Sequence, residues 1–273
     1  MEGYKKVLFL FSITFCVSLS AFTLNPFSYF KKDETVKIEF EFEKIDEETI
    51  AEKYAWNDFQ QIYPGAAQII NDILVKYNLS PEKIIFIIQK SEKSPCGLHA
   101  YTTVFFSENF IQLVENACLN NNEHSIVYNA INYQKSDFIL LFKAILKHEL
   151  QHYFDLINCV LNKKKFDLFK QKCGDKSKVY FMRLLEKRAD ILLQDNPKEI
   201  RLLAQSLLAS YEYNKNNMTE EEFETFLQEK DTHPSGVERY HYLMAFAYSV
   251  EQGRWEEFIT NFMKDECPLF YEG

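Results

Sequence analysis

The segment AILKHELQHYFDL, residues 144–156, places two histidines and a glutamate in an otherwise apolar stretch. The chain has only 6 histidines, and two of them, His148 and His152, stand four positions apart here. On a helix this spacing puts both imidazoles on one face, so both can reach a single ion. Two imidazoles and a carboxylate in a core helix are costly unless they have partners. The segment therefore predicts a buried helix that binds a metal.

The same segment has the form H-E-x-x-H, which is typical of zinc metalloproteases. A bound Zn²⁺ lowers the pKa of a coordinated water to about 7, and a neighbouring carboxylate takes its proton as the water attacks a carbonyl. Glu149 stands beside the histidines and is the predicted general base.

Catalytic zinc needs a third protein ligand and keeps its fourth position open. The best candidate downstream is Glu186 in LLEKRADILL, residues 184–193. Asp190 lies one helical turn later, where it can accept a hydrogen bond from a ligating histidine. The alternative is that both acids belong to a solvated face and pair with neighbouring basic side chains, namely Arg183, Lys187 or Arg188.

Three segments, HELQH at 148–152, EKRAD at 186–190 and THPSGVERY at 232–240, together resemble the HtpX and CAAX-prenyl-protease group of zinc metallopeptidases, which are gluzincins. The segment HAYTTVFFSENFI, residues 99–111, also resembles the part of that family just upstream of its metal helix. The resemblance covers roughly residues 83–245. The membrane-embedded members have several transmembrane helices, whereas this chain has no apolar run of that length after its leader. It is therefore expected to be a compact, exported relative.

The resemblance implies that His148, His152 and Glu186 bind one zinc ion per chain, with Glu149 as the catalytic base. It places Asp190 behind a ligating histidine. It also implies that His233 approaches the metal or the developing oxyanion as a second catalytic residue, and that Arg239 braces the site or contacts substrate.

The composition is that of a globular protein. Hydrophobic residues make up 47% and charged residues 26% of the chain, which argues against wholesale disorder. The net charge of −9 argues against a nucleic-acid binder, because such proteins usually carry a basic face.

The first 24 residues have the pattern of an export leader, with Lys5 and Lys6 before an apolar centre and small residues near Ser20. Either this leader is cleaved, or it remains as a membrane anchor, since its apolar character continues to Leu24. In both cases residues 25–273 form one domain outside the cytoplasm, either periplasmic or secreted. The oligomeric state is left open.

The pattern of apolar residues predicts an α+β fold that is predominantly helical, with a small N-terminal sheet followed by helices and a zincin-like HExxH helix. We expect strands at residues 36–44, 83–89 and 99–107, an exposed connection at 120–136 and a Lys-rich loop at 162–178. We expect helices at residues 46–62, from 64 to about 77, 108–119, from Asp137 as cap to 161, 179–194, 198–213, 219–229, 235–251 and 253–264.

The sequence thus predicts an exported zinc endopeptidase that acts on proteins or peptides. A substrate would add as an extended strand along a sheet edge at residues 101–106. One alternative is a zinc-binding chaperone or assembly factor of the cell envelope with little turnover. A second is a helical structural protein whose motif binds no metal.

Overall fold

The computed structural model describes residues 50–90, 96–99, 103–119, 125–129, 131–161, 177–229 and 233–266. These residues all belong to the compact unit Phe42–Gly273. They are mostly helical and include a small sheet, as the sequence predicted. The predicted leader, the strand at 36–44 and residues 162–176 of the Lys-rich loop lie outside the described residues.

A four-stranded sheet has the order β1-β2-β4-β3, with β1 at Ile50–Tyr54, β2 at Ile85–Gln89, β3 at Cys96–His99 and β4 at Thr103–Ser107. The two central strands, β2 and β4, run parallel, and each outer strand is antiparallel to its neighbour. All five residues of β4 are buried. Burial along the whole strand is expected where both faces of the sheet are covered.

The sheet corrects two predictions. Residues 50–54 were predicted to be helical, but they form β1 because they pair with β2, with Tyr54 opposite Phe86. Tertiary pairing here outweighs the local helix preference of Glu52 and Lys53. The predicted substrate edge at 101–106 is also wrong for its described part, because β4 is paired on both sides and the edge strand is β3.

A second, two-stranded sheet was missed. Strand β5 at Ile126–Tyr128 pairs with β6 at Ile131–Tyr133, in a segment that was predicted to be an exposed connection. Ile126 and Tyr133 are buried, whereas Val127 is exposed. A polar-looking segment therefore contributes two side chains to the core through a short hairpin.

Helices α2 (Trp56–Ile62), α3 (Pro64–Lys76) and α4 (Glu108–Leu119), together with the short helix η4 (Pro81–Lys83), accompany the sheet. A cluster of buried aromatic side chains joins them. Phe59 of α2 stacks on Phe86 of β2, with ring centroids 4.5 Å apart. Phe106 of β4 contacts Phe142 of the next helix, and Phe142 contacts Phe110 of α4.

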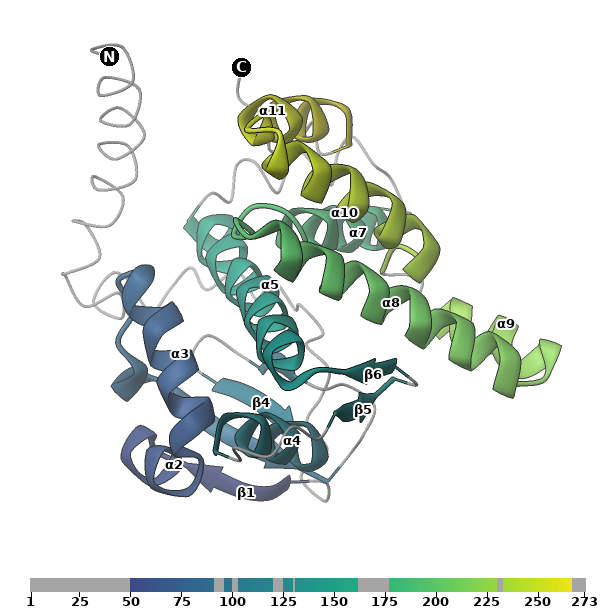
Figure 1. The fold of residues 1–273 in the computed structure, drawn as a ribbon. Helices are drawn as coiled ribbons and strands as arrows, with labels where there is room; N and C mark the ends of the chain where they lie inside the picture. Colours follow the sequence, from purple (N-terminus) through teal and green to yellow (C-terminus); the bar gives the residue numbers. More distant parts are fainter. Residues whose placement is uncertain are drawn as a thin grey trace, which may run out of the picture. The chain divides into compact units, whose positions relative to one another are not determined.

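The long helix α5 (Lys135–Leu161) lies between two groups of elements (Figure 1). It packs against α3, α4 and β3 on the sheet side and against α7 (Ser177–Ala189) and α8 (Pro197–Asn217) on the other. Its first half is apolar because it fills this contact, and Phe138, Leu141 and Phe142 are fully buried. The helix begins at Lys135, so Asp137 lies in its first turn instead of capping it.

Within the described residues, no helix has both the length and the apolar character needed to cross a membrane.

The remaining helices are α9 (Glu220–Glu229), α10 (Gly236–Glu251) and α11 (Trp255–Glu266). A capping box precedes α9, because Thr219 and Glu222 exchange backbone and side-chain hydrogen bonds. Helix α10 begins against α8 at Gly236. A β-carbon there would lie 2.6 Å from the carbonyl oxygen of Leu207, so only glycine fits.

Candidate metal centre

The two histidines of the predicted motif lie side by side on one face of α5. The Nε2 atoms of His148 and His152 are 3.0 Å apart, and the two rings are nearly perpendicular. The side chain of His148 is buried and that of His152 is half-buried. A spacing of four residues has therefore produced the predicted pair of imidazoles.

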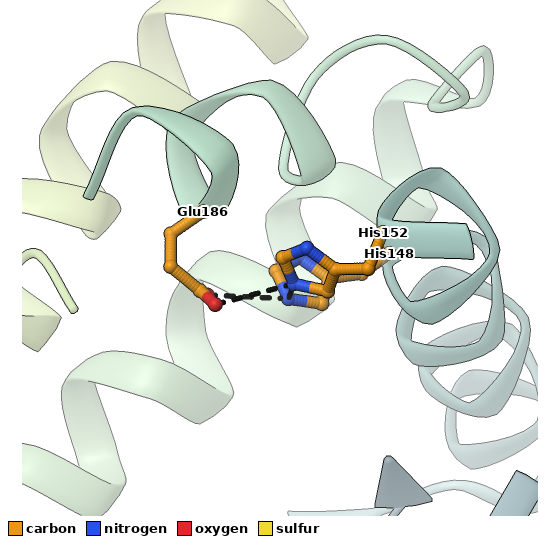
Figure 2. A group of neighbouring side chains, drawn as sticks. All are labelled: His148, His152 and Glu186. Atoms are coloured by element: carbon orange, nitrogen blue, oxygen red, sulfur yellow. Dashed lines mark hydrogen bonds and ion pairs between the residues drawn. The ribbon is translucent and has the colours of Figure 1, made fainter. Parts of the chain in front are cut away.

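Helix α7 carries Glu186, the candidate for the third ligand. The carboxylate oxygens of Glu186 lie 3.3 Å from His148 Nε2 and 3.2 Å from His152 Nε2. Figure 2 shows the carboxylate pointing from its own helix toward the two imidazoles on α5. One potential ligand atom from each of the three residues lies within 4.8 Å of the others, and no further residue joins this group in the part of the chain that the structure describes.

The chemistry of this group fits a cation. Glu186 is only 4% exposed, and its Oε2 atom accepts no hydrogen bond from the described residues. Burial raises the pKa of Glu186, but His152 and His233 outweigh burial and hold it well below its usual range. Burial lowers the pKa of His148, but Asp190 and Glu186 outweigh it and raise that pKa. The pocket therefore favours positive charge, and a divalent ion with nitrogen and oxygen ligands would supply it.

Asp190 lies behind His148 and is fully buried. Its Oδ1 atom is 2.9 Å from His148 Nδ1. The guanidinium of Arg239 donates to both oxygens, with Nε 2.8 Å from Oδ2 and Nη2 2.5 Å from Oδ1. Burial alone raises the pKa of Asp190, but Arg239 and His148 lower it to about 2. The carboxylate is thus ionised and lies next to the His148 ring, where a group that orients a ligating histidine would stand.

Tyr242 is a member of this network that the sequence did not indicate. Its hydroxyl donates a hydrogen bond to Oδ2 of Asp190. Burial, followed by the negative charge of Asp190, raises the pKa of Tyr242 well above its usual value, so the group stays a donor. The available signal was its position three residues after Arg239, which puts the two side chains on one face of α10.

His233 and Arg239 both reach the site. His233 Nε2 is 3.2 Å from Glu186 Oε1, and its side chain is 38% exposed. Arg239 Nη1 is 3.7 Å from Glu186 Oε2. Arg239 therefore braces Glu186 and Asp190 together. His233 touches the carboxylate and does not join the three mutually close ligand atoms.

The alternative of a solvated acidic face does not hold, because Glu186 and Asp190 are buried. Two of the basic residues named for that alternative have a different partner: Lys187 and Arg183 approach Glu238 of α10 at 2.9 Å and 3.9 Å.

Glu149, the predicted base, is half-buried on α5. Burial raises the pKa of its carboxyl, and the charges of His148 and His152 offset part of that rise. A carboxyl with a raised pKa is better suited to take and return a proton near neutral pH.

No match was found for this chain among models of protein families, curated proteins or solved structures. The chain is an α+β protein with a possible three-residue metal site.

Proposed function

We propose that this chain is a zincin-like, zinc-dependent endopeptidase that hydrolyses peptide bonds of proteins outside the cytoplasm. The observation that carries the proposal is the meeting of His148, His152 and Glu186 at one point, with a buried carboxylate oxygen that lacks a hydrogen-bond donor among the described residues. The order of HELQH, EKRAD and THPSGVERY along the chain, which resembles the HtpX and CAAX-prenyl-protease group, adds support.

In this proposal the three residues hold one zinc ion, which when bound lowers the pKa of water and polarises a carbonyl. Glu149 takes the proton of the attacking water and returns it to the departing amine, a role that typically contributes 10²–10⁴-fold in rate. Asp190 fixes the orientation of the His148 ring, 2.9 Å away.

His233 is suited to donate to the developing oxyanion because it lies beside Glu186 with 38% of its side chain exposed. Loss of such a donor typically costs 10²–10³-fold in kcat. Arg239 holds Asp190 in place through its hydrogen bond to the carboxylate.

Substrate binding is assigned to strand β3, Cys96–His99. This strand is at one end of the sheet order and packs against α5, the helix that carries the two histidines. A peptide that pairs with its outer edge would bind through backbone hydrogen bonds, which tolerate many sequences.

The test is the Glu149→Gln variant, which keeps the size of the side chain and removes the base. We expect stoichiometric zinc by metal analysis and a 10²–10⁴-fold loss of casein cleavage. His148→Ala is the matched control and should lose both zinc and cleavage. Full activity of Glu149→Gln, or wild-type protein without zinc, would contradict the proposal.

A second candidate is a zinc-binding chaperone or assembly factor of the envelope with little turnover. The contact between His233 and Glu186 favours it, because an imidazole so near a ligand can block the position that a catalytic site keeps open. Wild-type protein that contains zinc and cleaves no casein, while His233→Ala cleaves it, would support a blocked site.

A further inference from the structure

An ion pair with a buried carboxylate connects the two helices that carry the candidate ligands, and it uses none of the candidate ligand atoms. Asp155 of α5 is 2% exposed and lies three residues after His152. The guanidinium of Arg188 on α7 donates two hydrogen bonds to the Asp155 carboxylate: Nε is 3.1 Å from Oδ2 and Nη2 is 2.8 Å from Oδ1. Arg188 stands between Glu186 and Asp190 in the sequence, so the pair lies next to the site along both helices.

A third side chain fixes the acid. Gln151 lies between the two histidines in the motif, and its amide donates to Asp155 Oδ1 at 2.8 Å. Gln151 is 5% exposed, so this contact is shielded from water. The carboxylate of Asp155 therefore has donors from both α5 and α7, which together fix its rotamer.

A two-armed pair of this kind is directional. A guanidinium and a carboxylate that meet through two parallel hydrogen bonds constrain distance and angle together, whereas an ammonium acts as a point charge. The separation of α5 and α7 at Asp155 also sets how far Glu186 stands from the two imidazoles. Because the backbone at Glu186 and Arg188 belongs to one helical turn, a shift at one position moves the other.

We propose that Asp155 and Arg188 are positioning residues for the metal site: they hold α5 and α7 at the spacing at which Glu186 meets His148 and His152, so that the ligands are arranged before an ion binds. This inference rests on the proposed metal binding and is independent of peptide cleavage. A ligand set that is already in place loses less conformational freedom on binding, and loss of supporting contacts around metal ligands typically lowers affinity 10–100-fold.

The test measures zinc affinity of the full chain by competition with a chromophoric chelator, and the absorption spectrum of the Co²⁺-loaded protein. Asp155→Asn keeps the shape of the side chain, and Arg188→Lys keeps the charge but removes the two-armed contact. We expect each to weaken zinc binding about 10–100-fold and to alter the Co²⁺ spectrum. The matched control is Arg201→Lys, which breaks a similar two-armed pair with Glu251 between α8 and α10. It should bind zinc as the wild type does.

A purely structural role gives a different result. If Asp155→Asn and Arg188→Lys melt earlier than the wild type but bind zinc with wild-type affinity and spectrum, the positioning role is refuted. If one variant does not fold, the other decides the question. Wild-type protein that binds no zinc overturns this inference and the proposed function together, whereas zinc binding without casein cleavage contradicts only the peptidase.

Discussion

At the residue scale, the most constrained group of the site is the carboxylate of Asp190. It is fully buried and is surrounded by Arg239, Tyr242 and His148. A buried charge without such partners would be strongly destabilising, and each hydrogen bond to a charged group contributes about 1.5–3 kcal/mol. Its orientation therefore depends on all three neighbours.

The Tyr242→Phe variant tests this dependence. It removes one donor to Asp190 and keeps the ring, so we expect a loss of about 1–3 kcal/mol in the free energy of unfolding. Zinc affinity should fall as well, by up to about tenfold, because the support of His148 is looser. Urea unfolding and chelator competition measure the two effects. Tyr248→Phe on the same helix, where the side chain is 53% exposed, should change stability by less than about 0.5 kcal/mol. Equal stability of the two variants would refute the role of Tyr242.

At the element scale, a cluster of charges fastens α5 to three other parts of the chain. Asp195, in the connection from α7 to α8, meets Lys76 of α3 and Lys147 of α5. Lys147 is buried and also contacts Glu199 of α8 at 2.7 Å. Lys147 directly precedes His148, so this cluster holds α5 just before the histidine pair, whereas the proposed Asp155–Arg188 contact holds it just after.

This cluster predicts a pH dependence of stability. Burial raises the pKa of Asp195, but Lys147 and Lys76 outweigh it and hold that pKa below its usual value. A depressed pKa means that the contribution is complete above the unfolded value of about 3.9 and is lost as the pH falls below it. Asp195→Asn should therefore be less stable at pH 7, by about 1 kcal/mol, since the side chain is 55% exposed and solvent screens the charge. In thermal melts between pH 7 and pH 3, the melting temperature of Asp195→Asn should approach that of the wild type at the acid end.

The matched control is Asp72→Asn, an exposed carboxylate on α3 whose partner is the neutral amide of Gln68. Its melting curves should follow the wild type over the whole pH range. A gap between wild type and Asp195→Asn that stays constant down to pH 3 would show that the charge of Asp195 does not carry the effect.

The elements also show how far the sequence alone can lead. Helix α5 and strand β2 were predicted because their apolar runs report burial directly. Strand β1 and the β5–β6 hairpin were not predicted. Polar residues such as Glu52 in β1 and Asn132 in β6 become part of a strand only through pairing with a neighbouring strand. His148 and His152 followed from spacing on one helix. Glu186 and Asp190 were candidates from their spacing on one helix, with an alternative left open, and a resemblance added to them. Tyr242 was missed because 52 residues separate it from Asp190.

At the scale of the whole described unit, the possible metal site lies where α5 meets α7, while the other flank of α5 packs on the sheet side (Figure 1). An ion held by His148, His152 and Glu186 would cross-link two helices that are distant in sequence. Binding that favours the folded chain then adds directly to its stability, by about 2.7 kcal/mol when free ligand is 100 times its dissociation constant.

Zinc should therefore raise the melting temperature of the wild type. For a chain of this size, 1 kcal/mol corresponds to about 2–4 °C, so buffered zinc at that excess should add about 5–10 °C, and chelation should reverse the gain. Glu186→Gln should lose most of this increase, because an amide is a poorer ligand for zinc than a carboxylate. His241→Gln, at an exposed position on α10, should keep all of it. A melting temperature that is the same with zinc and with chelator in the wild type would mean that no ion joins α5 to α7.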